Sequence, residues 1–147
     1  MEPQGGTELQ FALLEKHCPK ELLDQVQICT SIPGKVPLHP IKLNILWQKN
    51  SWDQPNIYPW FQDKKNHTKY DWYVFNSHWN FENFTKKFGL DKGKCMVIKN
   101  GISKIEPALI YEKDKPIKII HQITPWRGLN VLLGAMQLVN NPLISLD

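Results

Sequence analysis

The sequence is poor in arginine, in cysteine and in long hydrophobic runs, and each shortage excludes a class of protein. The three cysteines, Cys18, Cys29 and Cys95, lie far apart and form no C-x-x-C pair, so neither a zinc site nor a disulfide framework is predicted. No apolar run reaches the roughly 18 residues of a membrane-spanning helix, and no basic-then-apolar leader opens the chain. We therefore expect a cytoplasmic protein with reduced thiols.

Arginine is the scarcest of the charged residues, and its single position is informative. Of the 18 basic residues only Arg127 is an arginine, so lysine is the expectation at any basic position of this chain. The formal net charge of +4 and the pI near 8.9 suit an anionic small ligand, a nucleic acid or an acidic membrane surface equally well. The charge alone therefore selects no partner, but it directs attention to the loop that carries Arg127.

What the chain does contain is an alternation of strand and helix patterns over 147 residues, 41% of them hydrophobic and 22% charged, which indicates a globular protein. Apolar, β-rich runs predict strands at residues 26–30, 41–48, 71–76, 95–98, 117–123 and 143–146. Helices are predicted at residues 9–17, between Ser77 and Gly89, and at residues 129–139. Strands that alternate with helices call for a parallel sheet with helices on both faces, which is the α/β class.

A glycine pair opens the first predicted helix, in the run Gly5-Gly6-Thr7-Glu8, with Thr7 as a candidate N-cap. Paired glycines let the backbone approach a ligand closely, but they also form ordinary structural turns, and both interpretations stay open. In a Rossmann-like unit such a loop follows a β-strand, whereas only four residues precede Gly5. The pair is therefore a candidate ligand loop whose own strand is missing.

The strand predicted at residues 41–48 is followed by an irregular loop, residues 49–59, which carries Lys49, Trp52 and Asp53. Proteins of the α/β class bind ligands at the carboxyl ends of their parallel strands, so this is a candidate binding loop. Its aromatic residues either stack on a sugar or pack beneath the loop, and both interpretations stay open. The next segment, residues 64–70, has the lysine content of a solvated connector.

A strand, a short loop and a helix follow one another between residues 117 and 139, the arrangement that α/β proteins use for phosphates. The loop contains Arg127 and Gly128. A guanidinium group pairs well with two phosphate oxygens, but Arg127 would also be accommodated by packing on Trp126 or by pairing with a carboxylate. The helix carries an apolar stripe that we expect to face a core: Leu129, Leu132, Leu133 and Met136.

Four motifs, in this order, resemble the GT-B fold glycosyltransferases of the group 1, or family four, type. They are residues 5–8 (GGTE), 70–77 (YDWYVFNS), 97–102 (VIKNGI) and 124–129 (TPWRGL). The resemblance covers nearly the whole chain. It implies two Rossmann-like domains that face each other across a cleft and move a sugar from a nucleotide-sugar donor to an acceptor, with retention and without a metal or other cofactor.

The resemblance also implies roles for individual residues. Gly5 and Gly6 would line the cleft near the donor phosphates. Asn100 and Gly101 would mark the exit from the N-terminal domain. A further pair, Arg127 and Gly128, would match the Lys-Gly or Arg-Gly pair of the C-terminal domain, whose cation meets the donor diphosphate.

The chain departs from the family pattern at several points. A second cation that many relatives carry is replaced by Gln122, and Lys49 stands where many relatives place a histidine near the acceptor. The first strand of the N-terminal domain is absent, and so is the pair of glutamates that holds the donor late in the C-terminal domain. We therefore expect a fragment that is inactive alone.

The resulting expectation is an incomplete GT-B arrangement. Residues 1–105 would form a partial acceptor-side domain, 106–116 a linker, and 117–147 the first β-α-β of the nucleotide-sugar-binding domain. The partners would be a nucleotide-sugar and a glycan or lipid-linked acceptor, without nucleic acid, in the cytoplasm or at the inner face of a membrane. The alternatives are a non-catalytic basic module that binds nucleic acid or glycan, and an inactive remnant.

Overall fold

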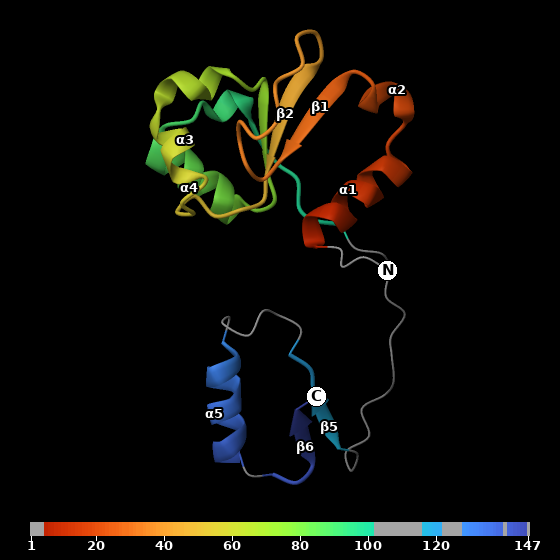
Figure 1. Cartoon of the computed structure of the whole chain (residues 1–147), viewed down its shortest axis with the longest axis vertical. Coiled ribbons are helices and arrows are strands. Elements are labelled where there is room, and N and C mark those ends of the chain that lie inside the picture. Colours follow the sequence, from red (N-terminus) through yellow and green to blue (C-terminus); the bar gives the residue numbers. More distant parts are fainter. Residues whose placement is uncertain (1–4, 102–115, 122–127, 140, 147) are drawn as a thin grey trace. The chain divides into compact units, whose positions relative to one another are not determined.

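A parallel sheet of four strands, in the order β1-β2-β3-β4, is the centre of the N-terminal part of the chain (Figure 1). Its strands are β1 (Val26–Thr30), β2 (Leu43–Gln48), β3 (Trp72–Phe75) and β4 (Cys95–Val97). The computed structural model describes residues 5–101, 116–121, 128–139 and 141–146. The chain divides into two compact units, Met1–Ser103 and Lys104–Asp147, and each is described by itself.

Helices flank this sheet, an arrangement that is consistent with a Rossmann-like α/β fold. They are α1 (Gly6–His17), α2 (Lys20–Leu23), α3 (Tyr58–Gln62) and α4 (His78–Phe88), with short 3-10 turns at Lys64–Thr68 and Lys92–Lys94. The start and end of α4 follow the predicted signals. The Ser77 hydroxyl accepts a hydrogen bond from the Asn80 backbone N–H (3.1 Å), and Gly89 ends the helix with φ +71°.

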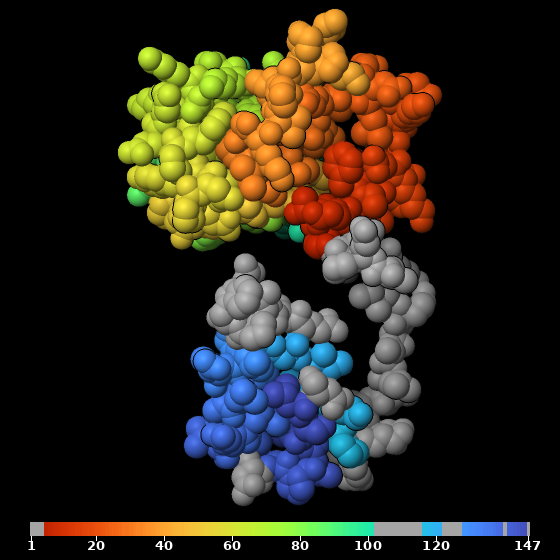
Figure 2. Space-filling view, in the orientation of Figure 1, coloured from red at the N-terminus to blue at the C-terminus, as the bar shows by residue number. Residues whose placement is uncertain are grey.

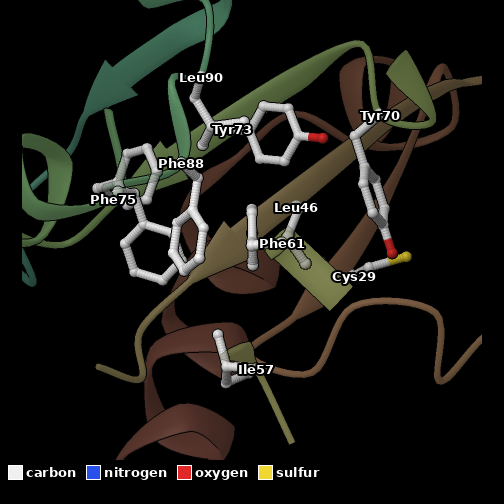
Figure 3. Close-up of a cluster of buried hydrophobic side chains, with 10 residues drawn as sticks. Cys29, Leu46, Ile57, Phe61, Tyr70, Tyr73, Phe75, Phe88 and Leu90 are labelled. Atoms are coloured by element: carbon white, nitrogen blue, oxygen red, sulfur yellow. The ribbon is translucent and has the colours of Figure 1, made fainter. Parts of the chain in front are cut away.

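The register of the strands places one row of apolar side chains on a common face: Cys29 pairs with Leu46, Leu46 with Tyr73, and Tyr73 with Cys95. Aromatic rings from α3 and α4 pack on this row (Figure 3). Phe61 lies at the centre of the cluster, fully buried, with its ring centroid 4.7 Å from that of Phe84 and 5.5 Å from that of Phe88. This face therefore holds the core of the unit.

The helix α1 lies on the opposite face, but it packs there more loosely than α3 and α4 pack on the aromatic face. The helix α1 buries none of its residues. An apolar hollow remains between Leu14 of α1 and the sheet residues Ile28, Ile45, Trp47 and Val74. The two faces therefore contribute unequally to stability.

Several local expectations were wrong. The N-cap of α1 is Gly5, and Thr7 lies inside the helix. Ile41 precedes β2 and is 90% exposed. Tyr70 was expected in a solvated connector, but it is 1% exposed and belongs to the hydrophobic core. Its hydroxyl lies beside Cys29 (Figure 3) and accepts a hydrogen bond from the Gly34 N–H (3.0 Å). For Thr7 and Tyr70, a cap and a tertiary contact overrode the local pattern.

The second unit contains β5 (Ile117–Ile119), α5 (Leu129–Val139) and β6 (Ile144–Leu146), and its two strands pair in parallel. The bounds of α5 match the predicted helix. Leu133 of the predicted stripe is 44% exposed, so it does not face a core, while the other three residues of the stripe are half-buried. None of the helices in the described part of the chain has the length and apolar character needed to cross a bilayer.

Replacing Phe61 by alanine should remove the centre of the aromatic cluster. We expect Phe61→Ala to lower the free energy of unfolding by about 3–5 kcal/mol, because it loses buried apolar area and leaves a cavity. Trp79, which is 60% exposed, is the control: Trp79→Ala should change stability by less than about 0.5 kcal/mol. Chemical denaturation followed by circular dichroism measures both, and equal effects would show that the cluster is not the core.

Candidate functional site

The carboxyl ends of β1, β2 and β3 meet at one edge of the sheet because these strands are parallel. This is the edge at which open α/β sheets bind ligands. A groove of about 400 Å³ opens here. Its polar lining comes from the first turn of α1, from the end of β1 and from the loops after β1 and β2: Thr7, Glu8, Thr30, Ser31, Lys35 and Asn50. In Figure 2 the first turn of α1 (red) lies against the chain that follows β1 (orange).

The helix α1 begins at this edge, and the Glu8 carboxylate of its first turn folds back to the N-cap, with Oε2 2.6 Å from where a Cβ atom on Gly5 would lie. Its N-cap Gly5 is extended (φ −78°, ψ 168°) and provides no side-chain cap, so the first backbone N–H groups have no side-chain acceptor from the cap residue. These N–H groups and the helix dipole favour an anion at this position. A Cβ atom added to Gly6 would meet nothing within 4 Å, so this glycine is not required by packing within the protein.

Lys49 lies directly after β2 with its ammonium group held over an aromatic ring. The Nζ atom is 3.7 Å from the centroid of the Trp47 ring, is covered, and has no hydrogen-bond partner among the residues that the structure describes. Burial lowers the pKa of Lys49, and the nearby Glu8 carboxylate partly opposes this shift. An ammonium group can donate three hydrogen bonds, so an anion at this edge would supply the acceptor that the described residues do not.

Unsatisfied and strained groups concentrate at this edge. In the described part of the chain six buried side-chain polar atoms lack a hydrogen-bond partner, and five of them belong to Ser31, Trp47, Gln48, Lys49 and Asn80. Ser31 is also the one described residue other than glycine with a positive φ (63°). Because such groups cost free energy and cluster at functional sites, they mark this edge as the strongest candidate site of the first unit.

None of Lys49, Trp52 and Asp53, which the sequence placed together in one loop, lines the groove. The half-buried Trp52 ring packs against Tyr58 (centroids 6.2 Å apart) and against the hydrophobic core. The ammonium group of Lys87 lies 4.6 Å from the centroid of the same ring. Asp53 is exposed. Packing therefore accounts for the position of Trp52.

Asn100 and Gly101 are exposed at the end of the described part of the first unit. The Gly101 carbonyl accepts a hydrogen bond from Gln10 Nε2 (2.9 Å), which attaches this segment to α1. In the second unit Gly128 (φ +96°) directly precedes α5, and its carbonyl accepts the first hydrogen bond of the helix from Leu132. Arg127, the central residue of the sequence prediction, lies outside the described residues, as do Gln122 and Trp126.

Sequence reasoning missed the carboxamides at the edge. Gln48 (0% exposed) ends an apolar strand, and Asn80 (3% exposed) stands four residues before Phe84 on the inward stripe of α4. A polar residue on an apolar stripe was the available signal. In the second unit His121 was also missed: it follows β5, and its Nε2 is buried without a partner among the described residues.

Within the described ranges no three His, Cys, Asp or Glu side chains gather closely enough to hold a metal ion. All three cysteines are free thiols, as expected. No protein-family model matches the chain, and a search of curated proteins found no relative. Any assignment of function therefore rests on the residues and their geometry.

Replacing Lys49 by methionine should stabilise the protein. Methionine keeps an unbranched apolar chain over Trp47 and removes a covered, unpaired charge, so we expect the free energy of unfolding to rise by roughly 0.5–2 kcal/mol. The control is Lys87→Met, because Lys87 is an exposed lysine that also lies over a tryptophan. It should change stability by less than about 0.5 kcal/mol. A clear loss of stability in Lys49→Met would show that the cation–π contact supports the fold.

Proposed function

We propose that this chain is part of a retaining GT-B glycosyltransferase, and that the carboxyl edge of its four-stranded sheet binds the diphosphate of a nucleotide-sugar donor. The observation that carries the proposal is a helix N-terminus without a side-chain cap, with Gly5 as N-cap and Gly6 as first helical residue, near a Lys49 ammonium group that has no hydrogen-bond partner among the described residues. Both features favour an anion, and the open space at Gly6 leaves room for phosphate oxygens to approach the backbone.

The chemistry of sugar transfer explains why an anion site is needed. Negative charge grows on the leaving diphosphate as the glycosidic bond of the donor breaks, and fixed positive groups stabilise that charge. In this proposal the N–H groups at the start of α1 and the Lys49 ammonium act on the diphosphate from the first unit. The family resemblance gives Arg127 and Gly128 a part in binding the diphosphate as well, because a guanidinium group binds two phosphate oxygens at once. The glycan or lipid-linked acceptor then lies along the groove that contains Asn50.

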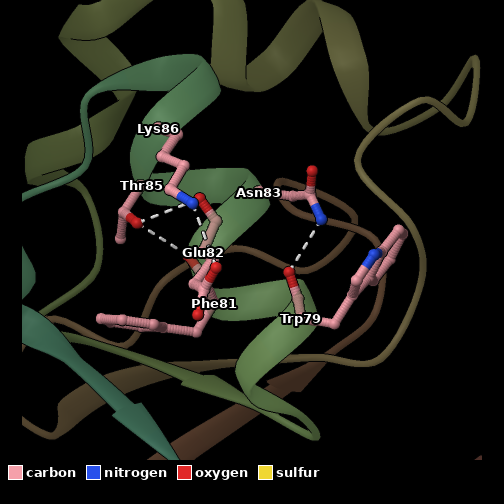
Figure 4. A network of polar contacts seen from close by, with 6 residues as sticks. All are labelled: Trp79, Phe81, Glu82, Asn83, Thr85 and Lys86. Atoms are coloured by element: carbon pink, nitrogen blue, oxygen red, sulfur yellow. Dashed lines mark hydrogen bonds and ion pairs between the residues drawn. The ribbon is translucent and has the colours of Figure 1, made fainter.

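A basic, non-catalytic module is the second candidate, and exposed lysines with nearby tryptophans favour it. Lys64, Lys65 and Lys69 are exposed, and so is Trp79 on α4. However, Lys86 is paired with Glu82 (3.1 Å) on the same helix (Figure 4), which neutralises part of this surface. Filter binding over a salt series separates the candidates. A steep loss of nucleic-acid affinity with salt supports the module, and stabilisation by UDP, GDP or ADP supports the transferase.

The glycine pair provides the sharpest test of the donor site. Gly6→Ala should leave the melting temperature unchanged or slightly higher, because the added methyl group meets only open space and alanine favours helix. If phosphates approach this backbone, the same methyl group should lower the affinity for nucleoside diphosphates roughly tenfold or more, as measured by isothermal titration calorimetry.

The matched control for Gly6→Ala is Gly134→Ala, because Gly134 lies inside α5 and a Cβ atom there also meets nothing within 4 Å. This variant should bind nucleoside diphosphates like the unaltered chain. Equal affinities of Gly6→Ala and the unaltered chain would remove the start of α1 from the site.

Arg127 is tested separately. Arg127→Ala should remove a charged hydrogen bond to the diphosphate and weaken nucleoside diphosphate binding by about 1.5–3 kcal/mol, with little effect on the melting temperature. Arg127→Lys should recover only part of the affinity, because a point charge replaces the planar fork. Binding that is unchanged in Arg127→Ala would exclude this residue from the site.

A further inference from the structure

The backbone that follows β2 is held by three side-chain carboxamides. The Lys49 carbonyl accepts a hydrogen bond from Asn76 Nδ2 (3.4 Å), which comes from the loop after β3. The next carbonyl, that of Asn50, accepts two hydrogen bonds, from Gln48 Nε2 (3.2 Å) and from Asn80 Nδ2 in the first turn of α4 (3.3 Å). Side chains from β2, from the loop after β3 and from α4 therefore donate to two successive backbone carbonyls.

These carboxamides are themselves fixed. Asn80 is 3% exposed and Gln48 is fully buried, so water does not compete readily for their N–H groups. Asn80 Nδ2 also donates to Asn76 Oδ1 (3.2 Å), which joins two of the three carboxamides directly. We refer to Gln48, Asn76 and Asn80 as the carboxamide cluster.

The position of the cluster relative to Lys49 follows from the two-residue period of a strand. Leu46 belongs to the aromatic core, so Gln48, two residues further, points to the same face. Trp47 and Lys49 point to the opposite face, where α1 lies. The cluster therefore binds the backbone carbonyls of Lys49 and Asn50 from the core face of the sheet. In this way it fixes the backbone from which the Lys49 side chain extends to the opposite face.

The cluster is a poor device for stability alone. The oxygens Gln48 Oε1 and Asn80 Oδ1 remain buried without hydrogen-bond partners. An unsatisfied buried acceptor costs free energy, and an apolar residue of the same shape would avoid that cost. The hydrogen bonds that the side-chain nitrogens of the cluster donate, in contrast, go to the carbonyls of Lys49 and Asn50 or to another member of the cluster.

We infer that Asn80, acting with Gln48 and Asn76, is a positioning residue that holds the Lys49 ammonium in place over Trp47 at the anion-binding edge. This inference rests on the proposed function for its ligand, but its geometry is independent of the ligand. Asn80 does not contact the anion; it acts through the carbonyl of Asn50 and the backbone of Lys49. The charged side chain known to act on Lys49 is that of Glu8 in α1.

The test replaces Asn80 by leucine, which has a similar shape, no hydrogen bonds and no charge. Asn80→Leu should still fold, and it should loosen the loop, because the Asn50 carbonyl then keeps only the hydrogen bond from Gln48. The Lys49 ammonium then gains water, so its NMR titration should move up toward that of the exposed lysines. The affinity for inorganic pyrophosphate, the probe common to all nucleoside diphosphates, should fall roughly tenfold in the same variant.

Asn83→Leu is the matched control. Asn83 lies one turn further along α4 and also donates its side-chain N–H to a backbone carbonyl, that of Trp79 (2.8 Å, Figure 4). It should change neither the Lys49 titration nor the pyrophosphate affinity. A second variant, Gln48→Met, removes the other donor to the Asn50 carbonyl with little change of shape. It is tested beside Asn80→Leu and gives the result on its own if Asn80→Leu does not fold.

The outcomes separate the inference from the proposed function. A Lys49 titration that is unchanged in both folded variants overturns the inference, even if pyrophosphate binds the unaltered chain. A titration that moves as expected, in a chain that binds no pyrophosphate, supports the positioning role and overturns the diphosphate site. A loss of pyrophosphate affinity with an unchanged titration also contradicts the inference, because Lys49 would then not be the group that the cluster positions.

Discussion

The parallel register of the four strands is the constraint on which the rest of the structure depends. It aligns Cys29, Leu46 and Tyr73 on one face, so that a single aromatic cluster stabilises the sheet. The same register brings the carboxyl ends of β1, β2 and β3 to one edge. A slip by one residue would exchange the two faces of a strand and place Lys49 among the aromatic rings, so the core and the site are specified together.

Local patterns in the sequence were sufficient for most elements. The strand at Val26–Thr30 and the helix at Leu129–Val139 have the predicted bounds, and Ser77 caps α4 as expected. These features depend on neighbouring residues, through apolar periodicity and side-chain caps. Tyr70 was misjudged because its burial depends on Gly34, which is 36 residues away. The loose packing of α1 on the sheet was missed for the same reason, since it is decided by contacts between elements.

In the candidate site, too, features set by neighbouring residues could be predicted from the sequence, and features set by residues far along the chain could not. Its place at the end of β2 was predictable from the strand pattern, because the carboxyl ends of parallel strands are where α/β proteins bind ligands. The separation of Lys49 from Trp52 was not predictable, because it depends on Tyr58 and the hydrophobic core beneath the loop. The role of Asn80 could not be predicted either: a lone carboxamide on a helix stripe gives no indication of the carbonyl, 30 residues earlier, to which it donates.

The distribution of unsatisfied groups connects stability to the proposed chemistry. The aromatic face of the sheet gives the first unit its stability, and the described unpartnered polar atoms of that unit gather at or next to the carboxyl edge. A protein selected for stability alone would replace a covered ammonium group or an unsatisfied carboxamide with an apolar residue. Of these groups the Lys49 ammonium, the Trp47 indole N–H and the Ser31 hydroxyl can donate to an anion, whereas the carboxamide oxygens of Gln48 and Asn80 cannot. An anion that displaced the Glu8 carboxylate from the start of α1 would offer an acceptor to Lys49 and to the helix N-terminus together, so a single ligand would offset the costs of both.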